Sequence, residues 1–182
     1  GCEKWLVEEM VALSFYEPML DATRFNTPLV NFDPENKMSW AEYFSRQNKY
    51  LSFEEYDYVF LLPWLKHGGA DLAALLHIQA AAEKGQVLVI TTEPVTSEWA
   101  SRLPENADLL PFGEILKEIP QSFQAKMLYA LLVAVKVVVV HVINSHLGWY
   151  LVENHGDALT QVVKLYVSLY CSRSTYGCTV HA

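Results

Sequence analysis

The sequence predicts an α/β fold: a doubly wound, Rossmann-like parallel sheet with helices on both faces, preceded by a helical extension. From residue 57 onward, short runs rich in valine, isoleucine and leucine alternate with longer amphipathic stretches. Each short run is apolar throughout, which is typical of parallel strands buried on both faces. The chain has 182 residues and is 52% hydrophobic, so it can bury one sizeable core.

Residues 1–52 are expected to form a helical extension and not an independent domain, because so short a segment buries little core. Apolar side chains at helical spacing predict a first helix over 3–14. Ser39 followed by Glu42 fits a capping box and predicts a second short helix directly after it. Residues 53–182 then form the Rossmann-like domain.

The domain alternates strands with helices along its whole length. Strands are predicted near 57–63, 87–92, 137–143 and 164–170, with a weak edge strand at 107–112. Helices are predicted at 69–85, at 97–103 after an N-cap at Ser97, at 122–135, at 145–156 ending at Gly156, and as a separate piece at 157–163. The stretch 127–144 changes from leucine and alanine to β-branched valine, which favours a helix followed by a strand over one membrane-spanning helix.

Composition and charge exclude several classes of protein. The formal net charge is −8 without a lysine or arginine cluster, so we expect no nucleic-acid partner. The odd set Cys2, Cys171 and Cys178 suits reduced thiols in the cytoplasm better than a disulfide framework. Neither HExxH nor CxxC occurs, and no metal site is predicted. The acidic N-terminal stretch does not fit a signal peptide, so we expect a soluble cytoplasmic protein.

Two adjacent glycines, Gly68 and Gly69, lie where the first predicted strand passes into its helix. They can serve a tight turn, or they can let a ligand approach the unpaired N–H groups at the helix N-terminus. The surrounding residues do not form a GxGxxG fingerprint, and Lys66 precedes the glycines instead of following them as in a Walker A loop. Glu93 closes the second predicted strand without that glycine set.

A second polar group lies at the end of the strand predicted near 137–143. It consists of His141, Asn144 and Ser145, which lie at or just past the strand end. Ligands of doubly wound sheets bind at the carboxyl ends of the strands. A histidine, an asparagine and a serine together could bind a hydroxyl-rich ligand. Equally, His141 could be a core residue and Ser145 only a helix N-cap.

Three motifs carry a resemblance to a known family: PWLKHGGAD (63–71), LVITTE (88–93) and HVINSHLGW (141–149). Over about two thirds of its length the chain resembles the N-terminal half of bacterial glycosyltransferases of the GT-B fold. More narrowly, it is similar to the retaining family that contains many polysaccharide and lipopolysaccharide sugar transferases. In that family two Rossmann-like domains face each other across a cleft; the first binds the acceptor and the second holds the nucleotide sugar.

The resemblance implies roles for the residues above. Gly68 and Gly69 would lie near the donor phosphates, and an acceptor or sugar would contact His141, Asn144, Ser145 and Glu93; no catalytic residue is assigned. The nucleotide sugar is a co-substrate and no other cofactor is implied. The other partner is a glycan or lipid-linked acceptor, and the resemblance also allows peripheral attachment of the complete enzyme to a membrane.

Two departures from the family pattern limit the function expected of this chain. Ile143 stands where the family commonly has a second histidine, and the two glutamates eight apart that mark the donor domain have no counterpart. We therefore expect the acceptor-side half of a glycosyltransferase, inactive without its donor domain. The alternatives are a non-catalytic carbohydrate- or protein-binding α/β domain, or a different nucleotide-using α/β enzyme.

Overall fold

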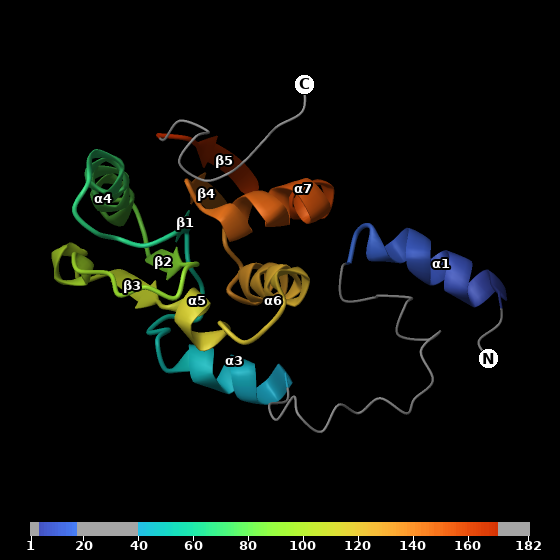
Figure 1. Ribbon diagram of the computed structural model, residues 1–182. Helices are drawn as coiled ribbons and strands as arrows, with labels where there is room; N and C mark the ends of the chain where they lie inside the picture. Colours follow the sequence, from blue (N-terminus) through green and yellow to red (C-terminus); the bar gives the residue numbers. More distant parts are fainter. Residues whose placement is uncertain (1–3, 18–39, 171–182) are drawn as a thin grey trace.

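The computed structural model of the protein describes residues 4–17 and 40–170 (Figure 1). Two helices, α1 (Lys4–Ser14) and α3 (Trp40–Asn48), precede a sheet of five parallel strands. The strands are β1 (Tyr58–Leu62), β2 (Val87–Thr91), β3 (Ala107–Leu110), β4 (Val139–Ile143) and β5 (Lys164–Ser168). The helices of the sheet region are α4 (Gly69–Ala82), η1 (Ala100–Arg102), α5 (Phe112–Ile115), α6 (Gln121–Ala134) and α7 (His146–Thr160). The Rossmann-like fold predicted from the sequence is confirmed.

The strand order is β3-β2-β1-β4-β5, with β1 in the middle. The chain runs outward from β1 to β2 and β3, then crosses back and continues from β4 to β5 on the other side. Because β1 is hydrogen-bonded to both β2 and β4, the order of strands reverses between β1 and β4. The strands that end near Pro63 and Ile143 are therefore neighbours. This reversal is where doubly wound sheets bind their ligands.

Helices cover the sheet on both faces, as expected. Figure 1 shows α4 on one face and α6 with α7 on the opposite one, and we call these the α4 face and the α6–α7 face. Alternate residues of β1 supply both cores: Val59 and Leu61 pack on the α6–α7 face, and Phe60 and Leu62 on the α4 face. Both faces of β1 are therefore buried, which explains its uninterrupted apolar sequence.

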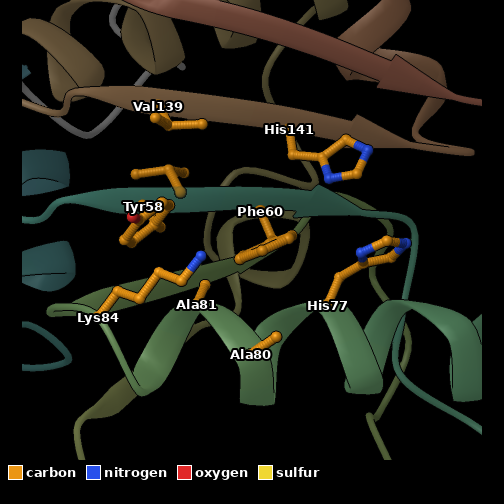
Figure 2. Close-up of a pocket in the computed structure, with 9 residues that line it drawn as sticks. Tyr58, Phe60, His77, Ala80, Ala81, Lys84, Val139 and His141 are labelled. Atoms are coloured by element: carbon orange, nitrogen blue, oxygen red, sulfur yellow. The ribbon is translucent and has the colours of Figure 1, made fainter.

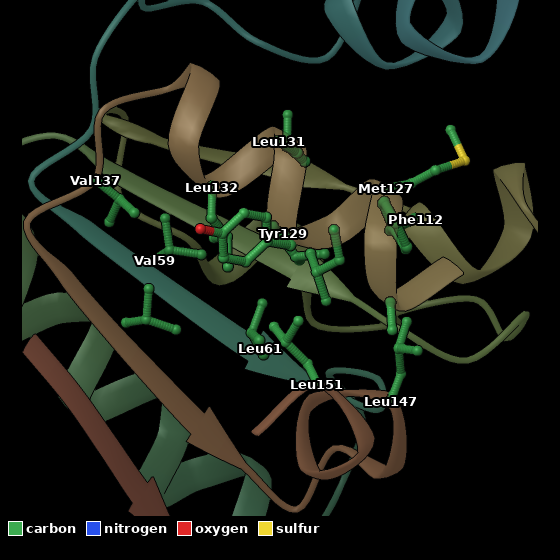
Figure 3. Close-up of a cluster of buried hydrophobic side chains, with 14 of the residues drawn as sticks. Val59, Leu61, Phe112, Met127, Tyr129, Leu131, Leu132, Val137, Leu147 and Leu151 are labelled. Atoms are coloured by element: carbon green, nitrogen blue, oxygen red, sulfur yellow. The ribbon is translucent and has the colours of Figure 1, made fainter. Parts of the chain in front are cut away.

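The α6–α7 face carries the larger core (Figure 3). Leu61 of β1, Leu132 of α6 and Leu151 of α7 are each fully buried there. Burying one such side chain contributes about 1.5–3 kcal/mol to folding. The valine-rich second half of the 127–144 stretch forms β4 and its first half forms α6, so the predicted change from helix to strand is confirmed.

The α4 face is covered less completely. Helix α4 connects β1 to β2 and lies over that side of the sheet, and no other α-helix among the described residues lies on this face. As a result Tyr166 of the edge strand β5 is 56% exposed. The expectation that every strand is buried on both faces is wrong for β5, because no crossover helix among the described residues lies above this edge strand.

Three local expectations need correction. Helix α7 does not end at Gly156 but continues to Thr160, so 157–163 is not a separate helical piece. A Cβ at Gly156 would meet only Val152 at an ordinary 3.6 Å, so this glycine neither breaks nor caps the helix. The stretch 97–103 forms only the 3-10 turn η1, and Ser97 does not cap it, because its Oγ accepts a hydrogen bond from Leu65 N at 3.1 Å.

Other local expectations are confirmed or lie outside the described residues. Helix α1 forms where the apolar spacing predicts it, α3 forms where a helix was predicted after Ser39, and β3 is an edge strand. The proposed capping residue Ser39 lies outside the described residues. Helix α5 was not predicted. Within 4–17 and 40–170, no helix is both long and apolar enough to cross a membrane.

A buried tyrosine ties the start of β1 to the edge strand β3. The Tyr56 hydroxyl donates to the Asp108 carboxylate, which also accepts from Ser52 N at 2.6 Å and from Ser52 Oγ at 2.8 Å. Burial, followed by the hydrogen bond to Asp108, raises the pKa of Tyr56 well above its ordinary value. This cluster fixes the segment between α3 and β1 against the sheet.

Candidate functional site

A groove of about 230 Å³ opens at the carboxyl ends of β1 and β4, where the strand order reverses. Three segments line it: the end of β1 and the loop after it, the first turns of α4, and the end of β4. Its lining residues are Leu62, Pro63, Trp64, His67, Ala70, Asp71, Ala74, Ile143 and Asn144. Small-molecule sites commonly measure about 300–1,000 Å³, so this groove suits a single sugar-sized group.

The two glycines beside the groove differ in their surroundings. Gly68 is the N-cap of α4 with an extended backbone (φ −176°, ψ 161°), and a Cβ there would lie 2.7 Å from Asp71 Oδ2. A Cβ at Gly69 would meet no atom within 4 Å, and Gly69 is not in the left-handed region. A Cβ at 68 would therefore displace the Asp71 carboxylate, whereas a Cβ at 69 has room.

The N-terminus of α4 already has a negative charge of its own. Asp71 lies in the first turn, and its Oδ1 accepts from Lys66 N at 3.2 Å. A carboxylate at this position is stabilised by the helix dipole. Burial raises the pKa of the Asp71 carboxyl, and the hydrogen bond from Lys66 N opposes that shift. A second anion at this helix end would be repelled by the Asp71 carboxylate.

Asn144 is the polar residue of the second motif that lines the groove. It has φ 52°, a conformation that asparagine tolerates better than most residues. Its Oδ1 accepts from Tyr170 N at 2.9 Å, and its own N–H donates to Ser168 O at 3.2 Å. Asn144 thus turns the chain out of β4, holds the end of β5, and faces the start of α4 across the groove.

Ser145 is completely buried and is not among the residues that line the groove. Its Oγ caps α7 by accepting from Gly148 N at 2.9 Å and lies 2.9 Å from Thr92 Oγ1. Because Thr92 donates its only hydroxyl proton to Leu62 O, Ser145 must be the donor to Thr92. This chain of hydrogen bonds joins the carboxyl ends of β4, β2 and β1, and it occupies the donor of Ser145.

His141 lies away from the groove, in the middle of the α4 face. Its ring contacts Phe60, His77 and Tyr166, and its Nε2 lies 2.8 Å from Ser168 Oγ. Burial, and then the proximity of His77, lowers the pKa of His141 below its ordinary value. The strand that carries His141, β4, pairs with β1, which leads to Gly68 and Gly69. The His141 side chain nevertheless does not line the groove beside these glycines.

Glu93 follows Thr92 directly after β2 and is partly exposed. Its N–H donates to Pro63 O at 3.0 Å, which extends the pairing of β1 and β2 past their ends. Its backbone is also covered by Gly113, where a Cβ would lie 2.6 Å from Glu93 C and 2.3 Å from Thr92 O. Its side chain is not part of the groove lining.

Trp64 and His67 were not predicted as site residues, although both lie within the motif PWLKHGGAD. The His67 ring makes an edge contact with Trp99, and its Nδ1 lies 2.7 Å from Glu98 Oε2. The ammonium of Lys66 lies 5.3 Å from the centre of the Trp64 ring. Both residues lie between the end of a strand and the start of a helix, where doubly wound sheets bind ligands, and this position could have identified them.

The fold and the groove define the class: a Rossmann-like α/β protein with a small aromatic and polar groove at the reversal of strand order. Comparison with models of protein families, with curated proteins and with solved structures found no match to this chain. Within the part of the chain that the structure describes, no three His, Cys, Asp or Glu side chains lie together as a metal-binding group.

Proposed function

We propose that this protein is the acceptor-side half of a retaining glycosyltransferase and that the groove after β1 binds a hydroxyl-bearing sugar of the acceptor. The observation that carries the proposal is the composition of the groove at the strand-order reversal. It combines the aromatic ring of Trp64 with the hydrogen-bonding side chains of His67, Asp71 and Asn144.

These side chains suit a neutral ligand with hydroxyl groups. A carboxylate accepts from a hydroxyl, an amide both donates and accepts, and an aromatic ring offers an apolar surface to the C–H groups of a sugar. The Asp71 carboxylate weighs against a donor diphosphate at Gly68 and Gly69, because the helix N-terminus is already compensated. The phosphate-binding role of these glycines stays a prediction.

In this proposal the protein positions the acceptor and does not stabilise the leaving group. A retaining transfer needs an acceptor hydroxyl held against the anomeric carbon and a neutralised diphosphate leaving group. The groove provides the first requirement. Cationic or N–H groups for the second would come from a donor-binding domain facing the carboxyl edge of the sheet.

Ligand titration tests the proposal. Neutral mono- and disaccharides should bind the chain, as followed by tryptophan fluorescence and by NMR shifts of the Asn144 amide, while NAD and ATP should not. Trp64→Ala should weaken saccharide binding at least tenfold. The matched control Trp5→Ala, which removes an exposed tryptophan on α1, should leave it unchanged. Binding of NAD or ATP alone would favour another nucleotide-using enzyme instead.

The transferase half and a non-catalytic carbohydrate-binding domain are separated by activity. The isolated chain should release no nucleotide from a panel of nucleotide sugars with glycan acceptors. If a gene encoding this chain also encodes a second domain with a pair of glutamates eight apart, the two together should turn over. Robust turnover by the 182 residues alone would refute the half-enzyme proposal.

A further inference from the structure

The α4 face holds a pair of histidines that the groove does not use. His77 projects from α4 and His141 from β4, and their ring centroids lie 5.4 Å apart with the planes at 69°. Figure 2 shows both rings at one end of a shallow groove of about 220 Å³, each with a ring nitrogen turned toward the space between them. Phe60 lines the same groove, and its ring centroid lies 5.6 Å from that of His141.

We propose that His77 and His141 bind a divalent late transition-metal ion, such as Zn²⁺, through their Nδ1 atoms. The sequence predicted no metal, because the two histidines are 64 positions apart, the difference between 141 and 77, and match no ligand spacing. Only the pairing of β1 with β4 and the crossing of α4 above them bring the two rings together.

The separation of the rings fits shared coordination. With metal–nitrogen bonds of about 2.0–2.1 Å, each ring centroid lies about 3.2 Å from the ion, and a tetrahedral angle separates the centroids by about 5.2 Å. The observed centroid separation of 5.4 Å is close to this value. An edge contact between two aromatic rings has a similar separation, so zinc titration decides between the two interpretations.

The second nitrogen of each ring already has a hydroxyl partner. His141 Nε2 lies 2.8 Å from Ser168 Oγ, and His77 Nε2 lies 3.0 Å from the Tyr170 hydroxyl. A hydroxyl accepting from Nε2–H leaves the lone pair on Nδ1, the tautomer that a metal-binding histidine needs. Outer partners of this kind orient the rings of metal-ligating histidines.

The chemistry of the groove selects the class of ion. Its lining contains no carboxylate, so it offers little to Ca²⁺ or Mg²⁺, which require oxygen ligands. Two neutral imidazoles suit Zn²⁺, Ni²⁺ or Cu²⁺, with water completing the coordination from the open side. Lys84, the cation of the groove, lies at the opposite end from the histidines (Figure 2).

Two protein ligands make a weaker site than the four of a structural zinc, so we expect a dissociation constant on the order of 10 µM. The ion would join α4 to β4. Through Ser168 and Tyr170 it would also hold the end of β5, the edge strand that no helix of 4–17 or 40–170 covers on this face. A structural clamp of the incompletely covered edge is the expected role.

The test uses the full chain with Cys2, Cys171 and Cys178 changed to serine, which removes competing thiolates. Calorimetric titration with Zn²⁺ should show one equivalent bound, and the melting temperature should rise with zinc concentration. His77→Gln should weaken binding at least tenfold. Because His77 is exposed on α4, this variant should fold normally.

The matched control is His155→Gln, which removes a partly buried histidine of α7 and should leave zinc binding unchanged. In nitrogen-15 NMR spectra, zinc should shift Nδ1 of His77 and His141 toward the coordinated range. Absence of zinc binding below 1 mM, taken as about 100 times the expected dissociation constant, would overturn the proposal. Equal zinc affinity in the wild type and in His77→Gln would overturn it too.

Discussion

Changing Ser145 to alanine should destabilise the protein without altering the groove after β1. The hydroxyl of Ser145 is fully buried, caps α7 through Gly148 N, and donates to Thr92 Oγ1. Alanine removes both interactions. Gly148 N–H is left buried without an acceptor, because the small residue at 148 lies directly against Ser145 and Val142.

The expected cost is the sum of two ordinary effects. Loss of a serine N-cap costs about 1 kcal/mol, and loss of one buried neutral hydrogen bond costs about 1 kcal/mol more. The free energy of unfolding should therefore fall by about 2 kcal/mol. For a chain of this length that corresponds to a melting temperature lower by about 4–8 °C.

Urea denaturation followed by circular dichroism measures the change, with Thr160→Ala as the control. Thr160 ends the same helix and has an exposed hydroxyl that bonds only to Asp157 O, so its loss should cost less than about 0.5 kcal/mol. Thr92→Val and the double variant complete a cycle, in which we expect a coupling of about 1 kcal/mol. A loss below about 0.5 kcal/mol for Ser145→Ala, or strict additivity in the cycle, would refute the buried hydrogen-bond chain.

Three further predictions concern other parts of the chain. Gly69→Val should change stability by less than about 1 kcal/mol, since the site has room and no left-handed backbone, whereas Gly68→Ala should cost more because its Cβ meets the neighbouring carboxylate; thermal melts compare the two. Tyr56→Phe should cost about 1.5–3 kcal/mol in urea denaturation by removing the hydrogen bond to Asp108. Since the pKa of Tyr56 is raised in the folded state, the wild type should also lose stability as the pH rises above about 10, and the variant should lose less. Burial lowers the pKa of His155, so the stability that its neutral form contributes should be lost as the pH falls below about 6.5; His155→Phe should flatten this dependence between pH 8 and pH 5.

Much of the fold follows from local patterns in the sequence. Runs such as VLVIT at β2 are apolar at every position, and only a strand buried on both faces accommodates that in a chain of this kind. The glycine pair lies at the start of α4, between the end of β1 and the first turn of the helix. These features depend on neighbours a few residues away, and for this reason they are readable without the tertiary structure.

The roles of the polar residues were less predictable. His141, Asn144 and Ser145 lie within five positions, yet the first projects onto the α4 face, the second lines the groove and the third is buried outside its lining. Successive residues of a strand place their side chains on opposite faces of the sheet, so a shift of one position changes the side. Which side is open then depends on helices that come from elsewhere in the chain.

The sequence by itself determined the alternation of strands and helices and the parallel sheet, and it predicted the edge at which a ligand would bind. The tertiary structure alone decided that Asp71 occupies the helix N-terminus beside Gly68, that Ser145 bonds to Thr92, and that His77 meets His141. The physical reason is range. Periodicity records whether a position is buried, but the partner of a buried or half-buried polar group is chosen by the packing of elements far apart in the chain.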